Sequence, residues 1–208
     1  LDELPEFKKH VLEVMRQPLE DSVVTIARAA LTLTYPAQFM LVAAMNPCPC
    51  GYATDSTNKC ACSAQIIQRY MSRISGPLLD RIDIHIEVPA VPFQKLADMK
   101  EGEPSKDIQA RVQKAREVQL SRFNKSANLF ANAQMESQDI KTHCGLDNES
   151  SELLRTAMDK LGLSARAYDR ILKVSRTIAD LDRKIKIDSG HISEAIQYRS
   201  LDRQLWLG

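Results

Sequence analysis

The sequence has few glycines and no loop of the kind that holds nucleotide phosphates. It contains only seven glycines among 208 residues, and the pattern G-x-x-x-x-G-K-[ST] does not occur in it. Such a loop uses a row of backbone N–H groups and a lysine to hold the phosphates. We therefore expect that this chain by itself does not bind a nucleotide tightly.

Long apolar runs and a large net charge are also absent. No stretch approaches the roughly eighteen consecutive apolar residues of a membrane span, and the acidic N-terminus lacks the basic start of a signal peptide. We expect a cytoplasmic protein with no membrane partner. The net charge of +1 gives no global reason to expect nucleic-acid binding, so any such binding depends on local patches.

Two local patches of positive charge are present. Residues 106–125 contain six basic residues and two acidic ones, and residues 166–186 contain seven basic residues and three acidic ones. On charge alone, a solvated helix face is a simpler interpretation of each tract than a DNA contact.

The first part of the chain has the pattern of an α/β structure. Two β-branched runs, 23–26 and 31–34, are separated by four residues and predict a hairpin. The apolar run 39–45 predicts a central strand buried on both faces, with Asn46 at its tip. Alternating residues over 82–88 predict a half-exposed strand.

Helical spacing accounts for much of the rest of the sequence. We expect a short helix over 8–16 that Pro18 stops, a second helix over 63–74 that Gly76-Pro77 breaks, and an irregular loop over 124–138. Four further helices are expected near 105–123, 149–162, 165–181 and 190–199.

Prolines 89 and 92 mark the boundary between these two parts. The predicted architecture is a partial α/β core over 1–92, in which a truncated parallel sheet carries the hairpin and a cysteine-rich insert at 47–62. An all-α lobe over 93–208 follows it.

Two adjacent acids follow an apolar residue at the start of the chain. If Leu1 ends a truncated central strand, Asp2 and Glu3 lie at its carboxyl end, where open α/β sheets bind ligands. One carboxylate then holds a hydrated Mg²⁺ while the other polarises a water for attack on a phosphate. The alternative from the residues alone is an ordinary solvated acidic pair.

Four of the five cysteines fall within one 15-residue window. Four thiolates match the tetrahedral preference of Zn²⁺, and a closed set of four is structural in character. The C-x-C spacing differs from the common C-x-x-C knuckle, so paired or free thiols remain alternatives, although a cytoplasmic protein disfavours disulfides. The fifth, Cys144, is expected to be a buried small apolar residue. The candidate ligands are Cys48, Cys50, Cys60 and Cys62.

Four further polar residues are notable for their positions. Asn46 at a strand tip can orient a water, and Arg81, at an exposed corner between a helical turn and a strand, can reach a neighbouring subunit. Arg166 lies in the first turn of its helix if Ser164 is the cap. Arginine suits developing phosphate charge because it stays protonated. The alternative for each arginine, Arg73 included, is that it takes part in an ordinary surface ion pair.

In chain order, the segments LDELPEF, AAMNPCPCGY, CAC, RYMSRISGPLLDRIDIHIEVP and LSARAYDRILKVSRTIADL resemble the magnesium-chelatase-like ComM/YifB family of AAA+ ATPases. The resemblance covers essentially the whole chain. The cysteine insert directly after the asparagine strand distinguishes this family from true chelatase subunits.

The resemblance implies a role for each candidate. Asp2 and Glu3 are then the Walker B pair and Asn46 is the sensor-1 residue. Arg81 is the arginine finger that acts across a subunit boundary, with Arg73 as the runner-up, and Arg166 is sensor 2. Because such fingers act between subunits, the resemblance also implies a ring, expected to be a hexamer.

The phosphate-binding loop that this family requires is expected to precede Leu1 in a longer parent protein. The resemblance implies that the parent hydrolyses ATP with Mg²⁺ and drives a helicase or branch-migration motor on DNA during recombination or natural transformation. Two alternatives stay open. One is a chelatase-type or protein-remodelling subunit, and the other is a zinc-stapled adaptor without ATPase activity.

Overall fold

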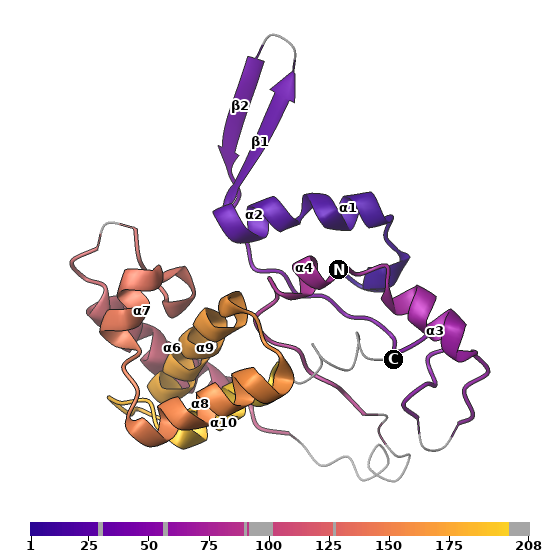
Figure 1. Cartoon of the computed structure of the whole chain (residues 1–208). Helices are drawn as coiled ribbons and strands as arrows, with labels where there is room; N and C mark the ends of the chain where they lie inside the picture. The colour runs from indigo at the N-terminus through magenta and orange to yellow at the C-terminus, as the bar shows by residue number, and fades with distance from the viewer. Residues whose placement is uncertain (29–30, 56–57, 90, 92–101, 127, 200–208) are drawn as a thin grey trace. The chain divides into compact units, whose positions relative to one another are not determined.

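The computed structural model describes residues 1–28, 31–55, 58–89, 91, 102–126 and 128–199. These residues fall into two compact units, Leu1–Ala90 and Val91–Ser200 (Figure 1). The predicted boundary at 92/93 lies outside the described residues.

The first unit is mainly helical and carries one hairpin. Its small core consists of Leu4, Leu12, Ile74, Leu78 and Leu79. Its elements are η1 (Leu4–Glu6), α1 (Lys9–Val14), α2 (Arg16–Asp21), β1 (Val23–Arg28), β2 (Leu31–Pro36), α3 (Ala64–Met71) and α4 (Gly76–Leu79).

Proline starts helices in this unit and does not stop them. The expectation that Pro18 ends a helix is wrong, because Pro18 lies in the first turn of α2, where its missing N–H would have had no helical partner. The helix ends at Ser22, which has a left-handed φ of 56°. Pro77 likewise lies in the first turn of α4, which the side chain of Ser75 caps.

The hairpin predicted from the β-branched runs is confirmed. Strands β1 and β2 pair antiparallel, from Val23 opposite Pro36 to Arg28 opposite Leu31, and they extend from the end of α2 (Figure 1). Because side chains alternate between faces, one face carries a threonine pair and the other is mostly apolar. Both strands are largely exposed. The hairpin follows the helices α1 and α2 in the chain, in the order expected.

A short parallel pairing joins the first residues to the segment that precedes the cysteines. The Leu1 nitrogen donates to the Val42 carbonyl (2.7 Å), the Ala44 N–H donates to the Leu1 carbonyl (2.8 Å), and the Leu4 N–H donates to the Ala44 carbonyl (3.0 Å). Hydrogen bonds to residues on both sides of Ala43 are those of a parallel pair.

Two expected strands do not form. Residues 39–45 are not a strand buried on both faces, since Met40 is 87% exposed and Val42 is 68% exposed. Residues 82–88 lie outside regular structure, and Val88 is 80% exposed. A strand is stable only within a sheet, and the strand pairing assigned among the described residues is limited to the hairpin.

The second unit is all-α, and its helices begin and end close to the predicted positions. Its core gathers eleven buried side chains from several helices, including Ile171, Leu172 and Ile192. No helix in the described part of the chain has the length and apolar content needed to cross a membrane. The elements are α6 (Ser105–Arg122), η2 (Asn132–Gln134), α7 (Ser137–His143), α8 (Asn148–Leu161), α9 (Ala165–Leu181) and α10 (Ser189–Gln197).

The region expected to be an irregular loop, 124–138, is more ordered than its polar sequence indicates. It contains η2 and the first residues of α7, and both Asn132 and Met135 are fully buried. The local pattern missed this because Asn132 is held by residues far away in the sequence.

A buried ionic network holds α6, η2 and α9 together. The Asp180 carboxylate, which is 0% exposed, accepts hydrogen bonds from Arg122 (2.7 Å), from Asn132 (2.8 Å) and from Arg176 (3.2 Å). The Asn132 amide also donates to the Thr177 hydroxyl at 3.1 Å. Each charge is paired inside the unit, so the network is costly to break.

We predict that Asp180→Ala lowers the free energy of unfolding by about 3–5 kcal/mol, because it leaves buried guanidinium groups without their carboxylate. The measurement is chemical unfolding followed by circular dichroism. As a matched control, Asp159→Ala removes a carboxylate that is 72% exposed and is expected to cost less than about 1 kcal/mol. Equal losses in the two variants would contradict this role for the network.

Candidate functional site

The parallel pairing brings three of the predicted site residues to one end of the first unit. Leu1 lies beside Ala43, so Asp2 and Glu3 leave one segment where Asn46 leaves the other. All three side chains are exposed. Two carboxylates and an amide therefore stand at the ends of neighbouring parallel segments, which is where α/β proteins bind ligands.

The backbone turns sharply at the acidic pair. Glu3 has a left-handed φ of 53°, an uncommon conformation for a residue with a side chain, and it immediately precedes η1. The Glu3 N–H donates to the Asp2 carboxylate at 2.9 Å. The Asp2 carboxylate thus accepts a hydrogen bond at the turn that starts η1.

Arg73 is tied to the segment that follows the acidic pair. Its Nη1 donates to the Pro5 carbonyl at 3.0 Å and to the Glu6 carboxylate at 2.9 Å. About half of each side chain in this ion pair is exposed, 46% for Arg73 and 53% for Glu6. Sequence reasoning did not find Glu6, since its partner lies 67 residues away.

Arg81 does not occupy an exposed corner, and this expectation is wrong. Its side chain is only 7% exposed, and its guanidinium donates to Glu20 of α2 and to the Pro77 carbonyl at 2.5 Å. The short α4 folds back onto α2, because Leu78 and Leu79 are buried in the core that also holds Leu12. The sequence carried no signal for Glu20, since this contact spans 61 residues.

Arg166 belongs to the second unit, whereas the other predicted site residues belong to the first. Ser164 is the N-cap of α9, as expected, and its hydroxyl accepts a hydrogen bond from the Ala167 N–H at 3.2 Å. Arg166 is exposed in the first turn of that helix.

The four clustered cysteines lie together as the sequence predicts. Their sulfur atoms lie within 4.8 Å of one another, and Cys48 Sγ is 3.3 Å from Cys50 Sγ and 3.7 Å from Cys60 Sγ. No disulfide joins them. A tetrahedron of thiolates around Zn²⁺ has sulfur–sulfur edges of about 3.8 Å, given Zn–S bonds of about 2.3 Å.

Comparison with known proteins places this chain in a family. The family model for magnesium chelatase, subunit ChlI, matches residues 1–96, and the model for the ChlI C-terminal region matches residues 102–199. Competence protein ComM of Haemophilus influenzae is 47% identical over 206 residues, which is 99% of this chain. The uncharacterized YifB proteins of Escherichia coli and Salmonella typhimurium are 42% and 40% identical over the same length.

The chain belongs to the magnesium-chelatase-like ComM/YifB family. It spans 39% of the length of these relatives. The structure agrees in part with the predicted fold class, because it shows a small two-stranded sheet with mostly helical content. The family resemblance drawn from the sequence motifs is therefore confirmed.

The basic tracts are not wholly solvated helix faces, because some of their side chains bond within the second unit. Arg176 is 3% exposed and donates to the carbonyls of Lys184 and Ile185, both at 2.7 Å. The Arg122 guanidinium forms a salt bridge with the Asp180 carboxylate, and Lys173 donates to the Ala133 carbonyl at 3.1 Å. Both tracts therefore serve the interior of the second unit in part, which neither sequence interpretation anticipated.

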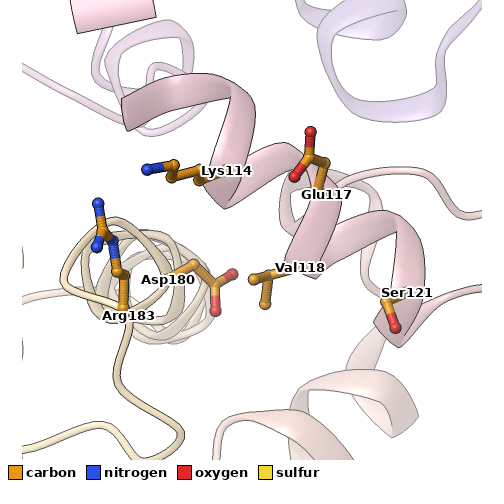
Figure 2. A pocket seen from close by; sticks show the side chains of 6 residues that line it. All are labelled: Lys114, Glu117, Val118, Ser121, Asp180 and Arg183. Carbon is orange, nitrogen blue, oxygen red and sulfur yellow. The ribbon is translucent and has the colours of Figure 1, made fainter. Parts of the chain in front are cut away.

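A pocket of ≈ 570 Å³ in the second unit contains none of the predicted site residues. It lies between α6 and the end of α9, and Figure 2 shows the Asp180 side chain directed toward α6. Of its two acidic residues, Glu117 and Asp180, the second is the carboxylate already paired in the buried network. Its lining residues are Lys114, Glu117, Val118, Ser121, Asp180 and Arg183.

The clustered thiols differ in acidity. Hydrogen bonds from the backbone N–H groups of Tyr52 and Ala61, together with the Cys48 thiol, lower the pKa of Cys50 to about 6. The N–H of Cys62 acts to lower the pKa of Cys60, but desolvation and the neighbouring thiols outweigh it and raise that pKa to about 12. The backbone hydrogen bonds therefore favour the thiolate form of Cys50 over that of Cys60.

The isolated cysteine behaves as expected. Cys144 is 4% exposed, and burial raises the pKa of its thiol to about 11. A thiol in such surroundings is protonated and unreactive at neutral pH.

We predict that iodoacetamide alkylates Cys50 much faster than Cys144 in chelator-treated protein at pH 7, because the thiolate is the reacting form. The rate at Cys50 should stay level above its pKa of about 6 and fall about tenfold per pH unit below it. Peptide mapping by mass spectrometry gives both rates. A rate at Cys50 that keeps rising up to pH 9 would contradict the assigned pKa.

Proposed function

We propose that the longer protein is an ATP-driven ring motor, expected to be a cytoplasmic hexamer, that acts on DNA. The observation that supports ATP hydrolysis is the parallel pairing of Leu1 with Val42 and Ala44. It aligns an acidic pair with a polar strand-tip residue, the combination that phosphoryl transfer uses to place a metal and a water. One relative is named a competence protein, which agrees with a role on DNA.

Each of the three aligned side chains then has a distinct task. Asp2 would hold Mg²⁺ through water, because Mg²⁺ keeps most of its hydration shell and takes few carboxylates. Glu3, whose backbone is left-handed, polarises the attacking water. Asn46 orients that water by hydrogen bonding. When bound, the metal neutralises charge that develops on the phosphate oxygens.

Two arginines from other parts of the chain complete the proposed ATPase site. Arg166, exposed in the first turn of α9, is proposed to contact the ATP phosphates as sensor 2. Arg81 is proposed to act across a subunit boundary. Since its guanidinium bonds Glu20 and the Pro77 carbonyl in this chain, that action requires it to exchange Glu20 for the partner's nucleotide.

We propose Zn²⁺ as the metal of the cysteine cluster. The donor set fits, because four thiolates suit a soft borderline cation and leave no open position for catalysis. The separations of 3.3–3.7 Å between Cys48, Cys50 and Cys60 fit a tetrahedral edge. The polar loop 47–62 contributes little to the core, so the metal supplies the cross-link that side-chain packing does not provide.

For the motor, we predict that the full-length protein hydrolyses ATP, that branched DNA stimulates the turnover, and that Glu3→Gln abolishes it. Glutamine keeps the shape but cannot polarise water as a carboxylate does. The measurement is phosphate release with and without branched DNA. An ATP turnover rate that branched DNA does not change would favour a chelatase-type or protein-remodelling subunit. The absence of any ATP turnover would favour a zinc-stapled adaptor.

For the metal, we predict about one zinc per chain by mass spectrometry of purified protein, because a Cys₄ set closes one tetrahedral site. Cys60→Ser should lower the zinc content several-fold. Cys144→Ser, which changes a cysteine outside the cluster, should leave it unchanged. Full zinc retention in Cys60→Ser would count against the proposed ligand set.

A further inference from the structure

Helix α3 connects the cysteine cluster to the acidic segment. Cys62 directly precedes Ser63, the N-cap of α3, whose hydroxyl accepts from the Ile66 N–H at 3.4 Å. Two other ligands, Cys48 and Cys50, follow Asn46 by two and four residues. A cross-link among these thiols therefore joins the start of α3 to the segment that carries Asn46.

The other end of α3 is attached to the segment that carries Asp2 and Glu3. Arg73 follows the last helical residue, Met71, by two positions. It binds both the Pro5 carbonyl and the Glu6 carboxylate, so it holds η1 at two points. Pro5 is buried beside Leu4, whose N–H donates to Ala44.

Helix α3 also carries a buried tyrosine between the two anchors. Tyr70 is 5% exposed. Burial is the main cause that raises the pKa of the Tyr70 hydroxyl, and the negative charges of Glu6, Glu3 and Cys48 raise it further. These charges act on one phenol only because the acidic segment and the cysteine cluster both lie near it.

We propose that Arg73 is a positioning residue for the acidic pair of its own chain, with α3 as the rigid element that the cysteine cluster fixes at its far end. This inference rests on the proposed ATPase function. It assigns Arg73 a role within one subunit, in place of the role across a subunit boundary suggested for it as an alternative arginine finger.

The energetics agree with positioning more than with stability. An ion pair that is about half exposed contributes little to the free energy of folding. Glu3, however, is held in a left-handed conformation that it would leave if the following turn were released. Loss of Arg73 should therefore disturb the carboxylate geometry while the fold survives.

A subunit-mixing experiment on the full-length protein separates the two roles. Arg73→Ala is mixed with Glu3→Gln, and ATP turnover is measured. If Arg73 acts within its own chain, both subunits have a defective site and mixing restores no turnover. If it acts across a boundary, the Glu3→Gln subunit supplies an intact Arg73 to its neighbour, and recovered turnover would overturn the proposal.

Steady-state kinetics provide the second readout. We predict that Arg73→Ala lowers kcat about ten- to a hundredfold with little change in KM, since misplaced catalytic groups cost rate more than binding. Arg73→Lys should recover most of the rate, because one ammonium can reach both acceptors that Nη1 serves. Arg69→Ala, which removes an exposed arginine of the same helix, should behave as wild type.

Hydrogen–deuterium exchange keeps the inference testable if the wild type shows no turnover, which by itself would contradict only the proposed function. Faster exchange of residues 1–7 in Arg73→Ala, and in Cys60→Ser with its metal lost, supports the coupling through α3. Unchanged exchange in both variants, with Arg69→Ala as reference, would overturn it.

Discussion

The candidate site depends on three backbone hydrogen bonds that join residues 1–4 to residues 42–44. The segments run parallel, so Asp2 and Glu3, which follow Leu1, lie at the same end of the pairing as Asn46, which follows Ala44 by two residues. Antiparallel pairing would have sent these groups to opposite ends. The buried side chain of Leu4 stabilises the arrangement, since it anchors one segment in the core of the first unit.

The cysteine cluster extends this constraint into the rest of the first unit. Its ligands follow Asn46 on one side and precede α3 on the other, while Arg73 beyond α3 returns to Glu6. Backbone hydrogen bonds, sulfur contacts and an ion pair thereby connect residues 1–6, residues 42–50 and α3 with one another. These contacts link the proposed metal site to the acidic pair.

The second unit is organised by a different interaction, the buried carboxylate of Asp180. It receives Arg122 from α6, Asn132 from η2 and Arg176 from its own helix. Two arginines of the basic tracts, Arg122 and Arg176, are thus directed inward. A DNA contact made by this unit would have to use the arginines and lysines that remain at the surface, Arg166 among them.

Local patterns in the sequence were sufficient for the hairpin, most helices, the cap at Ser164 and the grouping of the four cysteines, because these depend on neighbours close in the chain. The strands expected at 39–45 and 82–88 are not assigned as strands, because in the described part of the chain no sheet continues the short pairing of 42–44 with 1–4. The ion pairs of Arg73 with Glu6 and of Arg81 with Glu20 span 67 and 61 residues. Only the tertiary structure decides such contacts, because packing of the intervening helices sets which distant charges meet.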